Sequence, residues 1–507
     1  MARAPLSPRR TSLSLSILLM GALTLAAPPR TAQGAPAVTA VEAARTGNLA
    51  ALRAIVAAGG NVNAAGVDGT TPLLAAAVRG DADTAAFLLG HGARADQANR
   101  YGATPLRAAA TAGNIKLAEA LLTAGASPDA VRAESGDTPL MLAARAGHVA
   151  IVRALLARGA KVDRTDPLRS QTALMWAAAE GHADVARVLI EAGAPTAVLS
   201  KTKISPFMFA IRSGSVDTTR VFLDAGVNAN EPASDGTRPL VLAILNAHLD
   251  IAALLLERGA DPKVEDPHGQ PLLVLTFMRR AENRALSAVL PRQLPQTGVD
   301  AFKLAELLVA KGADINARYK GGGPPRHIAL GQYRAPFTGA TPFYVASITA
   351  DVPFMRFLVK LGANPALATD AGITPLLAAS GIGYWEGETP GGNQDAMEAV
   401  KLAFELGNDP KAVIPTTGKM DPTWLGANAL HGAANRGASV MVRWLADKGV
   451  PLDVKSVKGV SPYHIAAGLD SGQFHAWPET ASVILQIAKE QGVTIDTREP
   501  TFDRGGR

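Results

Sequence analysis

Histidine and carboxylate side chains are the first candidates for chemistry in this 507-residue chain. Three histidines, His268, His327 and His475, stand outside the repeated positions described below. None belongs to an HxxxH, HxH or HExxH pattern, which would place two metal ligands on one helix face. The chain also has no cysteine, which removes disulfides, thiolate metal sites, haem attachment and cysteine nucleophiles. We therefore predict no metal and no cofactor.

Hydrolytic chemistry would need an activated nucleophile or a pair of converging carboxylates. The chain has no GxSxG elbow, and the glycines between 381 and 387 miss the spacing of a phosphate-binding GxGxxG loop. We predict that the chain is not an enzyme. The alternative is a hydrolase that acts on an extracytoplasmic polymer through Glu386 or Asp421. It would require Glu386, Glu388 and His475 to meet in one deep pocket.

Aromatic side chains concentrate toward the C-terminal end. Five of the six tyrosines follow residue 300, and three of the five tryptophans lie in segments expected to be loops. Tyr and Trp dominate interface energetics, but a long loop also needs apolar anchors that hold it against the array, so both roles stay open. Trp176 and Trp444 instead take core leucine positions, which predicts packing. The candidate partner-binding residues are Tyr101, Tyr319, Tyr333, Tyr384, Trp385, Glu386, Trp424, His475 and Trp477.

The segment Gly381–Asn393, GIGYWEGETPGGN, is the sharpest local candidate. Its glycines and proline favour fixed turns, and two adjacent aromatic residues, Tyr384 and Trp385, precede a carboxylate. That composition suits a recognition loop held above a rigid scaffold. It also supports an alternative, a carbohydrate- or small-ligand-binding module in which the two rings form a stacking platform. The companion segment 416–424 would emerge at the opposite edge of the same unit.

The elements that position these residues come from one repeated unit, which is clearest at Thr138–Gln171. Thr138 can cap a helix with its hydroxyl, and Pro139 sits in the first turn, where its missing N–H costs nothing. Gly147 ends this helix, and a second helix with one aliphatic face follows and ends at Gly159. One unit cannot bury its apolar face alone, so neighbouring units must stack.

Helix-one starts recur along most of the chain, and most successive starts lie 32 to 34 residues apart. TPL-like triplets, paired alanines, Gly-His and an aliphatic helix recur in phase, most clearly from Thr138, Thr172 and Ala429. This pattern resembles the ankyrin repeat over about residues 37–492. The resemblance implies an all-α solenoid of about twelve turn–helix–helix units. The starts are Thr71, Thr104, Thr138, Thr172, Ser205, Arg238, Gln270, Thr341, Thr374, Asn428 and Ser461.

Two gaps exceed one period, 270–341 and 374–428, and each holds one second helix, at 302–311 and 395–406. The excess is predicted to be inserted loop. The five predicted insertions, all in the C-terminal half, are 281–300, 318–340, 381–394, 412–427 and 470–478.

Smaller departures from the pattern concern helix starts and turns. Arg238 and Gln270 replace the capping Thr, so we expect those helices to lack a side-chain cap worth about 1 kcal/mol each. Ser170-Gln171 and Lys203-Ile204 lack the Gly that usually precedes the triplet. We expect those two turns to depart from the family geometry.

Residues 1–34 have the pattern of a bacterial export signal. Arg3, Arg9 and Arg10 precede a short apolar run, Leu13–Leu25, and small residues follow it at the candidate cleavage sites. We predict a signal peptide and a periplasmic or secreted protein, with an uncleaved anchor as the alternative. The formal charge of +6 falls to +2 without this segment, because 46 basic residues then face 44 acidic ones. With no Lys/Arg block, we predict no nucleic-acid partner. Because no other run is long and apolar enough to span a bilayer, we predict no membrane span after leader removal.

The expected organisation is a signal peptide (1–34), regular repeats (37–269), repeats with inserted loops (270–492) and a tail (493–507). The resemblance implies a non-enzymatic scaffold that binds another protein through its turn tips and the exposed surface of its first helices. An extracytoplasmic enzyme, such as an oxidoreductase, is a partner that the resemblance suggests. We expect the half from Gln270 onward to carry specificity. The turn tips carry Asp68, Tyr101, Glu134, Arg169, Asp235, His268, Asp370 and Lys458.

Overall fold

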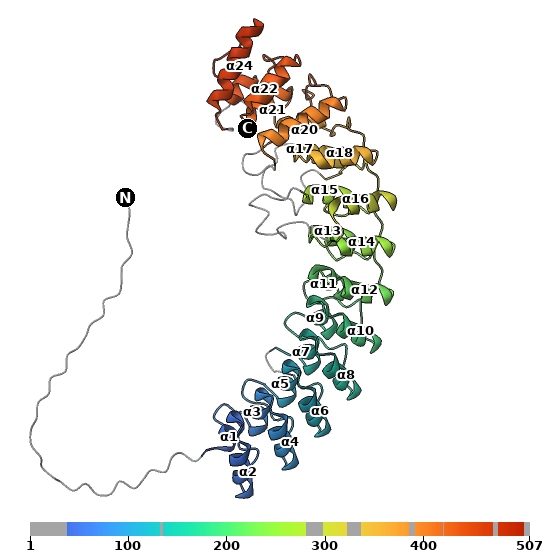
Figure 1. Cartoon of the computed structure of the whole chain (residues 1–507), viewed down its shortest axis with the longest axis vertical. Coiled ribbons are helices and arrows are strands. Elements are labelled where there is room, and N and C mark those ends of the chain that lie inside the picture. The colour runs from blue at the N-terminus through green and yellow to red at the C-terminus, as the bar shows by residue number, and fades with distance from the viewer. Residues whose placement is uncertain are drawn as a thin grey trace, which may run out of the picture.

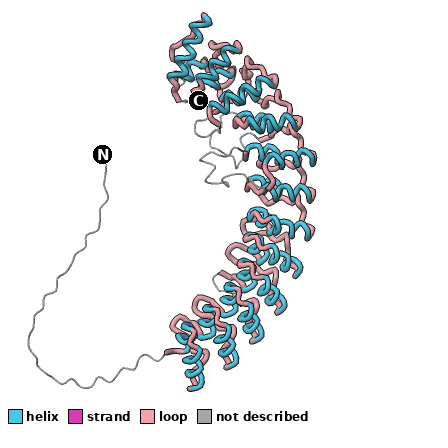
Figure 2. Tube along the Cα trace, in the orientation of Figure 1, coloured by secondary structure: helices cyan, strands magenta, loops and turns pink. Residues whose placement is uncertain are grey.

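The computed structural model describes residues 38–131, 135–279, 298–321, 336–384, 391–418, 420–469 and 475–500. Within these ranges the chain forms 24 α-helices, and its only β-type pairings are isolated bridges. The helices run in antiparallel pairs that stack into a curved array, with the first helices toward its inner edge and the second helices outside (Figure 1). Loops project along the inner edge (Figure 2). The predicted all-α solenoid is confirmed.

Each unit contributes one helix to each of two layers. The first helices are α1 (Ala40–Thr46), α3 (Pro72–Arg79), α5 (Pro105–Ala112), α7 (Pro139–Arg145), α9 (Ala173–Ala179), α11 (Pro206–Ser213), α13 (Pro239–Leu245), α15 (Pro271–Met278), α17 (Pro342–Ile348), α19 (Pro375–Ser380), α21 (Ala429–Asn435) and α23 (Pro462–Ala466). The second helices are α2 (Leu49–Ala57), α4 (Ala82–Gly90), α6 (Ile115–Thr123), α8 (Val149–Ala157), α10 (Ala183–Glu191), α12 (Val216–Asp224), α14 (Leu249–Glu257), α16 (Ala301–Ala310), α18 (Val352–Lys360), α20 (Asn393–Glu405), α22 (Ser439–Asp447) and α24 (Pro478–Gln491).

The helix starts follow from local chemistry. The Thr138 hydroxyl accepts a hydrogen bond from the Met141 N–H at 3.2 Å, and Pro139 occupies the first turn. The helices that follow Arg238 and Gln270 have no side-chain cap, which confirms that prediction. Contacts between successive first helices and between successive second helices bury one continuous apolar core from α1 to α24.

The two turns without glycine behave differently from each other. Both Ser170 (φ 53°) and Lys203 (φ 62°) adopt the left-handed backbone that Gly69 (φ 81°) has at the equivalent place. The Lys203 N–H donates to the Ser200 carbonyl, three residues back, as the Gly69 N–H does to Gly66, so the expected departure is wrong there. The Ser170 N–H instead reaches four residues back, and that turn is one residue longer.

Replacing Lys203 with glycine is expected to raise the free energy of unfolding by about 0.5–1 kcal/mol, since it removes the left-handed strain of a residue with a Cβ. Urea unfolding followed by circular dichroism measures this change. Lys203→Ala keeps the Cβ and should bring no gain. A glycine variant less stable than the alanine variant would contradict the strain argument.

The irregular half keeps the same two layers. The second helices predicted at 302–311 and 395–406 are present as α16 and α20. Among the described residues, no helix has both the length and the apolar character that crossing a bilayer requires. Several predictions fall outside the described ranges: the leader 1–34, most of the insertions at 281–300 and 318–340, the end of the tail at 501–507, and Glu134, His327, Tyr333, Trp385, Glu386 and Glu388.

Candidate functional site

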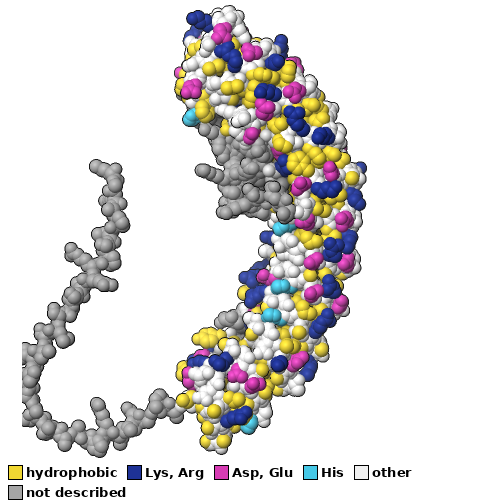
Figure 3. Space-filling model, in the orientation of Figure 1, with side chains coloured by type: hydrophobic (Ala, Val, Ile, Leu, Met, Phe, Trp, Pro, Cys, Tyr) yellow, Lys and Arg dark blue, Asp and Glu magenta, His cyan; other side chains and the backbone are white. Residues whose placement is uncertain are grey.

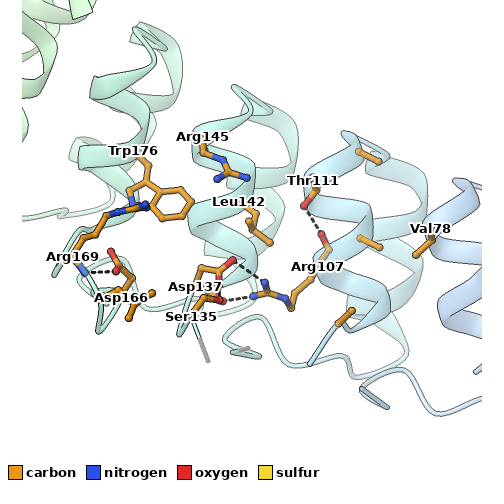
Figure 4. Close-up of a pocket in the computed structure, with 14 residues that line it drawn as sticks. Val78, Arg107, Thr111, Ser135, Asp137, Leu142, Arg145, Asp166, Arg169 and Trp176 are labelled. Carbon is orange, nitrogen blue, oxygen red and sulfur yellow. Dashed lines mark hydrogen bonds and ion pairs between the residues drawn. The ribbon is translucent and has the colours of Figure 1, made fainter. Parts of the chain in front are cut away.

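A hollow of about 670 Å³ lies on the concave side of the array, between the turn tips and the first helices α5, α7 and α9. Figure 4 shows side chains from all three helices and from the turns beside them around it. Val78 of α3 closes one end and Trp176 of α9 the other, while Leu168 and Arg169 come from a turn tip. The site is therefore assembled from several consecutive units.

The hollow exists because α5 presents a small side chain where the next two first helices, α7 and α9, present larger ones. Ala108, Leu142 and Trp176 each occupy the fourth position of their helix. The small side chain of Ala108 leaves space at the base of the hollow, and Thr111 and Ala112 line that base toward the end of α5. Leu142 and Trp176 then rise along the array as an apolar wall.

A buried ion pair joins α5 to the turn before α7. The Arg107 guanidinium lies 2.8 Å from the Asp137 carboxylate and also donates to the Asp137 carbonyl (Figure 4). The Ser135 hydroxyl donates to the same carboxylate. Arg107 and Asp137 are 7% and 8% exposed, so both charges are satisfied inside the protein. This pair holds the shape of the hollow and leaves little charge for a ligand.

The second carboxylate at the hollow is also engaged by the protein. Asp166 is buried and accepts the backbone N–H groups of Arg169 at 2.6 Å and Gln171 at 2.9 Å. These bonds hold the longer turn that contains Ser170. Asp166 is therefore a turn-forming residue, and its bond to Arg169 is made by the backbone N–H and not by the guanidinium.

Two guanidinium groups remain for a ligand. The Arg145 guanidinium lies 5.0 Å from the centre of the Trp176 ring, a cation–π distance, and the Arg145 side chain is exposed. Arg169 is exposed as well, and neither forms an ion pair with any described residue. The Trp176 ring is 8% exposed, and its buried Nε1 has no hydrogen-bond partner among the described residues. The predicted packing role of Trp176 therefore coexists with a place in the wall.

Three of the predicted partner-binding residues come together at the C-terminal end of α21. The Asn435 side-chain amide donates to the Tyr384 carbonyl at 2.9 Å, and the Arg436 guanidinium lies 4.0 Å from the Tyr384 ring centre. From the other side, the Trp477 indole N–H donates to the Asn435 carbonyl at 3.1 Å. The His475 ring lies 4.5 Å from the Trp477 ring. The described ends of two inserted loops therefore contact the same end of α21, and we call this place the loop corner.

The other described candidates lie apart from this corner. Trp424 has no exposed surface and Tyr319 is 9% exposed. These two rings therefore act as apolar anchors that hold their loops against the array, the second of the two roles left open for the loop aromatics. Tyr101 is 63% exposed at a turn tip in the N-terminal half. Tyr333, Trp385 and Glu386 lie outside the described residues.

Asp421, named for the hydrolase alternative, is an ionised turn residue in this structure. Burial works to raise its pKa, but hydrogen bonds from Thr423 and the charge of Lys458 lower the pKa further than burial raises it. The Thr423 N–H lies 2.9 Å from the carboxylate and the Lys458 ammonium 3.4 Å. A carboxyl group with a lowered pKa is poorly suited to act as a general acid near neutral pH.

The histidines in repeat positions hold the backbone together, as predicted. His148 Nε2 lies 3.3 Å from the Thr111 carbonyl and His182 Nε2 lies 3.0 Å from the Arg145 carbonyl, so each links two units. Within the described residues, no group of three or more His, Asp or Glu side chains could hold a metal ion.

His431 forms a capping box with Asn428 at the start of α21, and burial lowers its pKa from 6.5 to about 4. Between these pH values the unfolded imidazole binds a proton that the folded one does not. The neutral His431 ring thus makes its full contribution to the free energy of unfolding above pH 6.5. That contribution, up to about 3 kcal/mol, is lost as the pH falls toward 4.

The variant His431→Met isolates that contribution when its unfolding free energy is measured against pH and subtracted from that of the wild type. Methionine suits this position, because Met141 and Met175 are the third residues of α7 and α9, as His431 is of α21. The variant loses the hydrogen bond from the Asn428 N–H to the His431 ring at every pH, but its unfolding free energy should vary less between pH 6.5 and 4. Parallel pH curves for both proteins would refute the buried neutral imidazole.

Comparison with known proteins adds a family to this geometry. A family model described as ankyrin repeats (3 copies) matches residues 40–132, 124–200 and 193–266. No curated protein matches the chain. Among solved structures, the ankyrin repeat domain of human ASB11 is 28% identical, with a TM-score of 0.40. The match covers 44% of this chain and 98% of that domain.

Proposed function

Because this chain belongs to the ankyrin-repeat family, a family of protein–protein interaction modules, we propose that it is a non-enzymatic scaffold that binds another protein. We place the contact on the concave side, where repeat arrays present extended binding surfaces. The observation that carries this proposal is the hollow among α5, α7 and α9, where two guanidinium groups that pair with no described acid stand beside Trp176. Large aromatic and Arg side chains in a recess are the composition expected of a binding hot spot.

The mechanism is rigid presentation. Helices line the hollow, and the Arg107–Asp137 ion pair holds α5 to the turn before α7, so most of the contact groups are ordered before a partner arrives. Binding then costs little conformational entropy on this side of the interface. Of the contact groups named here, the exposed side chains of Arg145 and Arg169 are the ones that lose rotamer freedom when the partner docks.

The inserted loops form the second part of the proposed surface. Tyr384, His475 and Trp477 share one corner, and that clustering supports a role for these rings beyond single anchors. The two parts of this surface predict different contact sites. If the half from Gln270 onward carries specificity, the partner contacts the inserted loops, whereas the hollow predicts a contact in the N-terminal half. The stacking-platform alternative predicts a change in tryptophan fluorescence when glycans or cell-wall fragments are added.

We also propose that the protein works in the periplasm or outside the cell. The support is the basic and then apolar pattern of residues 1–34. N-terminal sequencing of the mature chain from the extracytoplasmic fraction tests this. A chain that starts at Met1 and stays in the cytoplasm would overturn it.

Site-specific photocrosslinking tests the protein-binding function. A photoreactive amino acid is placed at Leu168 on the rim of the hollow, at Tyr384 in the loop corner and, as a control, at Arg153 on the outer helix α8. We expect the same partner to be captured from the extracytoplasmic fraction at Leu168 and not at Arg153. Adducts at Tyr384 alone would move the contact to the inserted loops. Adducts equally strong at Arg153 would refute a concave interface.

A further inference from the structure

We propose that the hollow receives an extended segment of the partner that carries carboxylate side chains between apolar ones. This inference rests on the proposed function and specifies the chemistry of the partner at that site. It follows from the charges that remain unpaired, from the apolar wall beside them and from the spacing of the units.

Among the described residues that line the hollow, the charge left without an ionic partner is positive. Of its three arginines, Arg107 is matched by Asp137, which it contacts at 2.8 Å. Asp166, the other acid, is engaged by two backbone N–H groups. Arg145 and Arg169 are therefore the groups that a ligand meets, and each guanidinium presents a fork of N–H donors that fits a carboxylate.

Apolar side chains beside these charges favour a peptide over a polyanion. Leu142 and Trp176 form the wall, and Leu168 and Val78 stand at the rim with 59% and 70% of their surface exposed. A nucleic acid would need a denser array of cations, whereas Lys, Arg, Asp and Glu side chains are interspersed over the face shown in Figure 3. Carboxylates flanked by aliphatic or aromatic side chains satisfy both parts of the hollow.

The stacking of the units sets a register for that segment. Packed helices lie about 8–10 Å apart, and an extended chain advances about 3.3 Å per residue, so about three residues pass each unit. Arg145 belongs to the unit of α7, and Arg169 to the turn that leads into α9, the next unit. The two carboxylates that meet these arginines should therefore be about three residues apart in the partner.

Selection from a random peptide library against the purified chain tests this. Peptides of about twelve residues suffice to span four units. We expect enrichment of Asp or Glu pairs about three positions apart. Binding of the selected peptides should weaken at least about tenfold in Arg145→Glu/Arg169→Glu, because each substitution removes a charge-assisted hydrogen bond and places a like charge opposite the peptide carboxylate. Arg153→Glu/Arg220→Glu, the same charge change on the outer helices α8 and α12, should bind as the wild type does.

A steric variant separates this inference from the proposed function. Ala112 is exposed and lines the hollow, so Ala112→Trp fills part of the hollow while both arginines are kept in the sequence. Circular dichroism checks that each variant is folded. Peptides lost with Ala112→Trp but unaffected by the double charge reversal would overturn the acidic segment and leave the proposed site standing.

Two further outcomes count against the proposals. Peptides that bind Ala112→Trp as tightly as the wild type would overturn the hollow as the binding site, and the proposed function there with it. Competition by short single-stranded DNA at the concentration of the peptide would overturn the assignment of a protein segment as the occupant.

Discussion

Replacing Arg279 with methionine will lower the free energy of unfolding by about 3–5 kcal/mol, as expected when one partner of a buried ion pair is removed. The Arg279 guanidinium contacts the Asp351 carboxylate at 2.7 Å and 3.2 Å, and the Asp351 side chain is only 4% exposed. The same guanidinium lies 4.3 Å and 4.4 Å from the ring centres of Phe302 and Phe354. Without Arg279, a carboxylate remains buried beside two aromatic rings.

This cluster ties together the units on either side of an insertion. Arg279 follows α15, Phe302 belongs to α16, and Asp351 caps α18 by accepting the Phe354 N–H at 3.2 Å. The loss should therefore be local to α15–α18 in an array whose units contact only their neighbours. Urea unfolding gives the total change, and amide hydrogen exchange shows where protection is lost.

The matched control replaces both charges. Arg279→Met with Asp351→Asn removes the pair but keeps a capping side chain, as Asn48 and Asn114 do at the starts of α2 and α6. We expect this double variant to recover all but about 1–2 kcal/mol of stability. A single variant that loses no more than the double would show that the buried charge is not the cause.

Truncating Trp424 to alanine is expected to cost about 3–5 kcal/mol, the range for a large buried aromatic side chain. Trp424 has no exposed surface and lies in the segment that leads into α21. Backbone bonds between Ile414 and Ala427 at 2.9 Å, and between Gly426 and Ile414 at 3.0 Å, close this segment on itself. The indole then seats it on the core, and its removal leaves a cavity that this short loop cannot fill.

Comparison with Trp477 distinguishes packing from partner contact. Trp477 is half-buried and donates to the Asn435 carbonyl, so Trp477→Ala should cost less, about 1–2 kcal/mol. Thermal unfolding of the two variants, with peptide or partner binding measured in parallel, separates the two roles. If Trp424→Ala kept full stability and lost the partner, the ring would be a contact residue and the packing argument would fail.

Local chemistry made most of the fold predictable. Thr138, Pro139 and Gly147 specify a helix start and stop within ten residues of sequence, and their copies recur in phase. The same local rule also predicted the uncapped starts after Arg238 and Gln270. It failed at Lys203, because the stacked neighbours impose a left-handed backbone that the residue itself disfavours.

The sites were less predictable because they depend on residues far apart in the chain. The hollow requires a small side chain at Ala108 beside larger ones at Leu142 and Trp176, which matter only once three units are stacked. Tyr384 and Trp477 meet through Asn435, and no spacing rule relates those positions. A tryptophan at a helix position where the two preceding units have Ala and Leu was a signal for the hollow in the sequence.

A hollow walled by three successive units has a consequence for how such a chain can change over generations. Duplicating or deleting one unit is tolerated by the stack, since each unit meets only its neighbours. Insertion of another unit between the one that holds α7 and the one that holds α9 would separate Arg145 from Trp176 and erase the recess while leaving every helix intact. The length of the array can drift, but the order of these three units cannot change without loss of the site.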